Sequence, residues 1–185
     1  MARLPLASRE SVPEDQRAAF DEIVKGAGSV PRFGPGSVMI NVPHAHQRVM
    51  AVNKYLRTES SLPKKLQELA MLVTAREMDC QYIWNAQAPA GRRAGLSDAL
   101  VDALRDKKPL PAMPADEAAV VRYGLELTAT NQVSQETFQA ALDQLGAQGL
   151  TEFTTSMGYF RMLALNANAF TIDLPQQRTE PLLPV

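Results

Sequence analysis

The chain has 185 residues, of which 45% are hydrophobic and 21% are charged, as in an ordinary globular protein. Its 19 basic and 20 acidic residues give a formal net charge of −1, and no basic block of the kind that binds nucleic acid stands out. The sequence has no apolar run resembling a signal peptide or reaching the ~20 residues of a membrane-spanning helix. We therefore expect one cytoplasmic domain over residues 1–185, with neither nucleic acid nor a membrane as partner.

The spacing of apolar residues is helical along the whole chain, which predicts an all-α protein. In the first half, the predicted elements are a helix from about Pro13 to Gly26, a turn-rich connector over 31–36, a helix from Pro43 to Leu56 and another that begins after Pro63. The segment from Cys80 to Arg93 is expected to form a fourth helix, which Pro89 should kink or break.

The second half begins with a turn near Gly95 and a short helix that ends near Arg105. Residues 107–114 contain three prolines and form the clearest linker. Three further helices are expected at Ala115–Ala129, Gln135–Leu145 and Glu152–Ala169, with Ser134 and Thr151 as N-caps of the last two. The proline-containing residues after Asp173 are expected to form an arm over the surface or over a neighbouring subunit.

Cys80 is the only cysteine, so the chain has neither an intrachain disulfide nor a cysteine-rich metal site. At about 100° per residue it shares one side of its helix with Ile83, Trp84 and Gln87. Its place near the helix start favours a thiolate, because unpaired N–H groups and the helix dipole stabilise negative charge there. Asp79 opposes that effect, and packing is the more common role of a lone helical cysteine.

Glu68 lies twelve residues before Cys80, on the preceding predicted helix. An antiparallel turn between the two helices would bring its carboxylate over Cys80, among apolar neighbours. Such a carboxylate suits a general base or a proton relay. The alternative is a structural ion pair with Lys64, Arg76 or an arginine across a subunit interface.

Three segments resemble the carboxymuconolactone decarboxylase family, which includes alkylhydroperoxidase D: LPKKLQELAMLVTARE, then CQYIW with APAGRRAGLSDALVDAL, and later MGYFRMLALNANAF. The likeness covers about residues 62–170 and is weaker over 33–56, so the recognisable core is about 33–170 and residues 171–185 are a C-terminal arm. It implies an all-α orthogonal helical bundle of the alkylhydroperoxidase D type, with an antiparallel core helix pair. It also implies a small-molecule substrate and self-association as a trimer, a multiple of trimers or a dimer.

Peroxidases of the family carry a glutamate, a Cys-x-x-Cys pair and a histidine four residues after the second cysteine. On this chain those positions fall on Glu68, Cys80, Ile83 and Gln87. Ile83 cannot act as a resolving thiol, which excludes the intramolecular disulfide cycle. Gln87 cannot carry a proton near pH 7 as histidine does. A one-cysteine cycle with an external thiol stays open.

The leading expectation is a cofactor-free enzyme related to the lactone decarboxylases, which acts on a small organic substrate as a lyase, decarboxylase or isomerase. Glu68 would be the base, and Gln87 or Tyr159 would stabilise an enolate-like intermediate. One alternative is a thiol hydroperoxidase that uses Cys80 and an external thiol. Another is a non-catalytic ligand-binding or assembly protein with a degenerate site.

The remaining pocket candidates are Ile83, Trp84 and His44, although a helical tryptophan more often fills core or interface volume. Tyr159 either lines the cavity or packs a subunit contact. His44 and His46 are the nearest alternative proton carriers. Two residues apart on a helix, they point to opposite sides and cannot share a metal ion. We therefore expect no metal and no cofactor.

Overall fold

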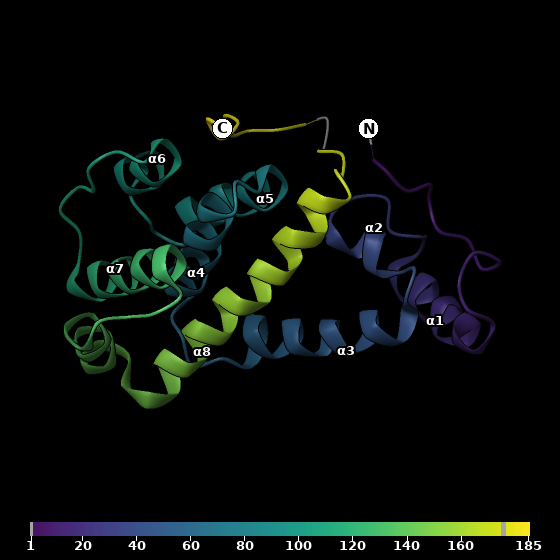
Figure 1. The fold of residues 1–185 in the computed structure, drawn as a ribbon, viewed down its shortest axis with the longest axis horizontal. Coiled ribbons are helices and arrows are strands. Elements are labelled where there is room, and N and C mark those ends of the chain that lie inside the picture. The colour runs from purple at the N-terminus through teal and green to yellow at the C-terminus, as the bar shows by residue number, and fades with distance from the viewer. Residues whose placement is uncertain (1, 175–176) are drawn as a thin grey trace.

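The computed structural model describes residues 2–174 and 177–185, and every regular element in these residues is helical (Figure 1). The elements are the short turn η1 (Glu14–Gln16), α1 (Arg17–Ala27), α2 (Pro35–Met39), α3 (Pro43–Lys54), the π-helical turn η2 (Tyr55–Glu59), α4 (Lys64–Glu77), α5 (Gln81–Arg93), α6 (Asp98–Asp106), α7 (Ala115–Thr130) and α8 (Gln135–Ala169). The expected all-α fold is confirmed. None of the helices in the described residues is long and apolar enough to cross a bilayer.

The helix α8 runs diagonally across the molecule and separates two groups of helices (Figure 1). The group α4 to α7 lies on one side of α8, and α1 to α3 lie on the other. α8 packs against α4, α7 and α5 in the first group and against α2 in the second. It is therefore the element that joins the two halves of the fold.

The helix α4 is the centre of the core, and every residue in its 66–76 segment is buried, because α5, α7 and α8 pack against it. Its buried polar side chains find partners inside the protein. The Gln67 amide donates to the Leu62 carbonyl at 3.0 Å, and the Thr74 hydroxyl donates to the Ala70 carbonyl at 2.7 Å. An unpaired buried polar group costs ~1–3 kcal/mol, so these bonds let a central helix hold polar residues.

The helices α4 and α5 form the expected antiparallel core pair, joined by a turn at residues 78–80. Asp79 has a left-handed backbone conformation (φ 47°) that reverses the chain. The Cys80 N–H then donates to the Ala75 carbonyl at 2.8 Å. α5 continues through Pro89 and ends at Arg93, so this proline does not terminate the helix.

Two predicted sets of helix bounds are wrong. The connector over 31–36 ends early, because Pro35 opens the short helix α2, where its fixed φ suits the first helical turn. The predicted break after Leu145 is confirmed at Gly146 (φ 65°, ψ 175°), where α8 is kinked, but the second part of the helix resumes directly after Gly146 and not at Glu152. Thr151 is therefore not an N-cap, since its hydroxyl donates to the Ala147 carbonyl inside the helix at 2.7 Å.

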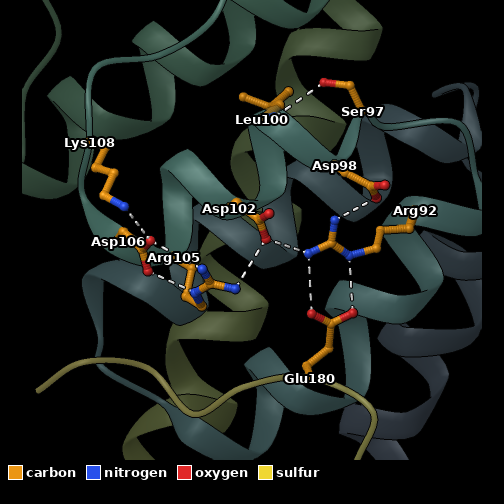
Figure 2. A network of polar contacts seen from close by, with 9 residues as sticks. All are labelled: Arg92, Ser97, Asp98, Leu100, Asp102, Arg105, Asp106, Lys108 and Glu180. Atoms are coloured by element: carbon orange, nitrogen blue, oxygen red, sulfur yellow. Dashed lines mark hydrogen bonds and ion pairs between the residues drawn. The ribbon is translucent and has the colours of Figure 1, made fainter.

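The described end of the C-terminal arm, residues 177–185, lies over α5. Leu183 is buried, and its N–H and C=O bond the side-chain amide of Gln81 at 2.8 and 2.9 Å. Figure 2 shows the guanidinium of Arg92 between Glu180 of the arm and two carboxylates of α6. These contacts tie the arm to the surface formed by α5 and α6.

Candidate active site

Glu68 lies in the middle of α4, and its side chain is fully buried. Its Oε1 atom accepts a hydrogen bond from Nη1 of Arg57 at 3.0 Å, and Nζ of Lys64 lies 3.7 Å from the same oxygen. The other oxygen, Oε2, has no hydrogen-bond partner among the described residues. Two cations thus accompany one carboxylate, and the excess positive charge favours an anion nearby.

Arg57 reaches Glu68 from η2, the π-helical turn that follows α3. Turns of this kind are frequent at functional sites. The guanidinium side chain is 28% exposed, and it lines a large cavity. Of the two partners only Arg57 is part of the described cavity wall, so Glu68 stands behind it.

The turn η2 is held by Glu152 of α8. This carboxylate accepts five hydrogen bonds at 2.7 to 3.1 Å, from Tyr55, Ser60, Ser61 and Gln148. Burial raises the pKa of the Glu152 carboxyl, but the hydrogen bonds outweigh burial and bring the pKa down to about 2. The ionised carboxylate thus fixes the turn that presents Arg57.

Cys80 is the N-cap residue of α5, and it is fully buried. Burial raises the pKa of its thiol, and hydrogen bonds from the backbone N–H groups of Ile83 and Tyr82 oppose that rise. Asp79, which was expected to oppose a thiolate, is paired with Arg76. In the part of the chain that the structure describes, Cys80 does not line the large cavity. Its thiol is therefore shielded and poorly ionised.

The face of α5 predicted to group Cys80 with three pocket residues is divided between core and cavity. Ile83 and Trp84 are buried in the main hydrophobic core. Gln87 is partly buried and lines the cavity. Of these three predicted pocket residues, the structure therefore brings only Gln87 to a space that could hold a ligand.

The cavity has a volume of about 730 Å³ and lies where α1, α2 and α3 face α8. Small-molecule sites commonly measure ~300–1,000 Å³ and combine an apolar wall with a few polar groups. Its wall has that character and includes Ile23, Phe33, Met39, Met50, Phe160, Leu163, His46, Asn53, Arg57, Tyr82, Gln87 and Tyr159. The arrangement suits an organic molecule with an apolar body and one anionic end.

His46 is the histidine that lines this cavity, whereas His44 lies outside its described wall. Burial lowers the pKa of His46, which keeps its imidazole neutral near pH 7. Its Nδ1 atom is buried and has no hydrogen-bond partner in residues 2–174 and 177–185. The same residues hold no cluster of three His, Cys, Asp or Glu side chains that could bind a metal ion. His46 thus contributes a neutral imidazole to the cavity wall.

Tyr159 of α8 lines the cavity and packs edge-to-face on Phe160, with ring centroids 5.2 Å apart. Burial raises the pKa of Tyr159 to about 12. The phenol therefore stays protonated at neutral pH and can donate a hydrogen bond into the cavity.

Sequence reasoning did not single out Arg57 or Tyr82 as site residues. A buried carboxylate at Glu68 requires a cation, and that requirement is the signal that could have led to Arg57. The sequence pointed first to lysine and arginine on the same helix, of which Lys64 does lie near the carboxylate. Arg76 is committed elsewhere, to Asp79.

Residues 43–122 match the sequence model of the carboxymuconolactone decarboxylase family. This segment contains the core pair α4–α5, together with Arg57, Glu68, Cys80 and Gln87. Over this segment the chain is similar to the carboxymuconolactone decarboxylase family. No curated protein matches the sequence significantly.

Solved structures of the alkylhydroperoxidase D type share the fold. An uncharacterised peroxidase-related protein from Ralstonia eutropha JMP134 is 18% identical, with a TM-score of 0.72 over 95% of this chain and 93% of that one. One from Silicibacter sp. TM1040 is 17% identical, with a TM-score of 0.69 over 95% and 92%. A cysteine-to-alanine variant of the debrominase Bmp8, in complex with 2,3,4-tribromopyrrole, is 11% identical, with a TM-score of 0.67 over 95% of each chain. Family and fold are consistent with an enzyme, and at these identities the likeness establishes the fold alone.

Proposed function

We propose that this protein is a carboxymuconolactone decarboxylase-like, cofactor-free enzyme that binds a small organic anion and transforms it by acid–base chemistry. The reaction would be that of a lyase, decarboxylase or isomerase. The observation that carries the proposal is the guanidinium of Arg57, which lies between the buried carboxylate of Glu68 and the 730 Å³ cavity.

Arg57 is the proposed anchor for the anion. A guanidinium binds carboxylates through paired N–H donors, and it stabilises an oxyanion that develops next to it. Glu68 holds Arg57 in place, and Lys64 adds a second positive charge. Glu68 therefore acts as a positioning residue in this proposal, in place of the direct base expected from sequence.

His46 is the proposed base, because a neutral imidazole at the cavity wall can accept a proton near pH 7. Proton transfer from an acidic carbon of the substrate leaves the electron pair on the adjoining carbonyl oxygen. Arg57, with the phenol of Tyr159 and the amide of Gln87, would stabilise that oxygen. Return of the proton to a different carbon completes an isomerisation. In a decarboxylation the C–C bond to the carboxylate breaks instead of the C–H bond: its electron pair passes to the same carbonyl oxygen, carbon dioxide leaves, and the carbon then takes up a proton from solvent.

A one-cysteine hydroperoxidase is the second candidate, favoured by the two backbone N–H groups that face the Cys80 sulfur. Against it stand the complete burial of the thiol and its raised pKa, since the thiolate is the nucleophile. A non-catalytic binding protein would need the same apolar cavity and no base. Proton exchange measured in His46→Gln and His44→Gln proteins separates that candidate from an enzyme.

The test follows proton transfer directly, by NMR detection of deuterium incorporation from D₂O into unsaturated lactones and β-keto acids. We expect His46→Gln to lower the rate ~10²–10⁴-fold, whereas His44→Gln, the matched control outside the described wall of the cavity, leaves it unchanged. Cys80→Ser should also retain the rate. Absence of exchange with the wild-type protein, or equal rates in the wild-type and His46→Gln proteins, would contradict the proposal.

Consumption of hydroperoxide with added thiol is measured beside this exchange. Turnover that disappears in Cys80→Ser would place the protein among one-cysteine peroxidases instead. Ligand binding in the cavity with neither activity would favour the non-catalytic alternative.

A further inference from the structure

A second, smaller hollow of about 360 Å³ lies next to the large cavity. Its wall comes from the start of α5, the end of α8 and the segment that follows α8. Tyr82 is the one residue, among those that the structure describes, that lines both spaces. Tyr82 is therefore the residue common to the two walls.

The helix α8 supplies part of the wall of each space. Leu163 lines the large cavity, and Ala167 lines the smaller hollow. These two residues are four apart on α8, so they lie on the same helix face, separated by one turn of about 6 Å. One continuous strip of α8 thus passes from the first space into the second, and Tyr82 stands where they adjoin.

The ring of Tyr82 is packed closely against the backbone of the segment before α2. A Cβ atom at Gly34 would lie 2.7 Å from the Tyr82 hydroxyl oxygen and 2.9 Å from the ring carbons Cε1 and Cζ. Gly34 also has a positive φ of 73°, which favours glycine. The backbone at Gly34, which also lines the large cavity, therefore lies directly against the Tyr82 ring.

We propose that Tyr82 determines the length of the ligand, by separating the large cavity from the smaller hollow. An anion held at Arg57 would extend its apolar part along α8 until it meets the Tyr82 ring. Removal of the ring would join the two spaces and admit longer molecules. This inference rests on the proposed function, in which Arg57 anchors an organic anion.

The test compares wild-type, Tyr82→Phe and Tyr82→Ala proteins with straight-chain carboxylates from butanoate to dodecanoate, by titration calorimetry. In the wild-type protein we expect the affinity to rise with chain length, reach a limit and then fall. Tyr82→Phe keeps the ring and should keep that limit. Tyr82→Ala should extend the rise, with Kd falling about fourfold for each further methylene that becomes buried. Equal limits in all three proteins would overturn the proposal.

A parallel series of straight-chain primary alcohols needs no cation, so it reports the length limit without Arg57. If carboxylates and alcohols both reach a limit that only Tyr82→Ala removes, the inference holds together with the anion site. If only the alcohols do so, the Tyr82 inference holds and the proposed anion site fails. Tyr82→Leu, which removes less volume, provides a folded variant in case Tyr82→Ala is unstable, and it should give an intermediate limit.

Discussion

Nη1 of Arg57 lies 3.0 Å from Oε1 of Glu68, yet the arginine side chain is 28% exposed and the glutamate side chain is 0% exposed. The pair therefore spans the boundary between the core and the cavity. Loss of Arg57 would leave the Glu68 carboxylate buried without its closest partner, and an uncompensated buried charge is strongly destabilising. The same interaction thus neutralises a buried charge in the core and holds Arg57 at the cavity wall.

Replacement of Arg57 should destabilise the protein much more than replacement of Lys64. Arg57→Met leaves the Glu68 carboxylate buried with only the half-exposed Lys64 as a cationic partner, and we expect a loss of about 2–4 kcal/mol in the free energy of unfolding. Lys64 is 49% exposed and lies 3.7 Å from the carboxylate, so Lys64→Met should cost at most about 1 kcal/mol. Urea unfolding of both variants checks this order, and similar losses for both would contradict it.

Cys80 should react slowly with alkylating agents at neutral pH. Burial raises the pKa of its thiol, and the buried sulfur is shielded from reagents. Iodoacetamide modification of the native protein should be far slower than that of the urea-unfolded chain, and should accelerate only above the ordinary thiol pKa. Because the native state holds this proton more tightly, its contribution to stability falls as pH rises from the unfolded pKa through the folded one. Rapid modification of the native protein at pH 7 would refute this account.

Glu152 should make the protein sensitive to acid. Its pKa of about 2 lies below the ordinary glutamate value, so the stability it contributes is present above pH ~4.5 and disappears as pH falls through about 2. The contribution is on the order of 3 kcal/mol. In Glu152→Gln that portion of the pH dependence should be missing from unfolding curves recorded between pH 2 and pH 7. A variant whose stability falls with acid as steeply as that of the wild-type protein would show that the effect comes from other carboxyl groups.

Two helical glycines should respond to alanine in opposite directions. A Cβ at Gly124 would lie 3.0 Å from Val73 and 3.2 Å from Met157, where α7 meets α4 and α8. We expect Gly124→Ala to lower stability by about 1–3 kcal/mol through overpacking. Gly158 is exposed in α8 with nothing within 4 Å, so Gly158→Ala should raise stability by about 0.4–1 kcal/mol. Thermal unfolding of the pair measures both signs, and a stabilised Gly124→Ala would disprove the tight packing.

The core of the fold could be predicted from sequence because its information is local. The apolar positions of residues 66–73, the turn before Cys80 and the helix that follows predict the α4–α5 pair without reference to distant residues. The predicted break between the last two helices spans residues 146–151, whereas in the structure only Gly146 leaves the helical conformation. The sequence from 146 to 149 contains two glycines, and the pattern alone does not show which of them breaks the helix. Local patterns thus predicted which elements exist better than where they end.

The site could not be predicted to the same degree, because its geometry depends on distant contacts. Arg57 points to Glu68 from a π turn that is fixed by Glu152, and the Tyr55–Glu152 bond joins residues 97 positions apart. His44 and His46 are the same residue type and lie two positions apart on the same helix, so the sequence alone does not tell them apart as site candidates. Only the place of the cavity distinguishes them, and that place is set by packing of α3 against distant elements.

The diagonal course of α8 has a consequence for synthesis of the protein. One wall of the cavity comes from α1, α2 and α3, which leave the ribosome well before α8, and the opposite wall comes from Tyr159, Phe160 and Leu163 of α8. In a growing chain the cavity is therefore incomplete until α8 emerges, and the apolar surface of α1, α2 and α3 that lines it stays uncovered until then. In the folded protein, a molecule bound in the cavity would contact both α1–α3 and α8. It should thus resist unfolding of the whole molecule more than local opening of any one helix.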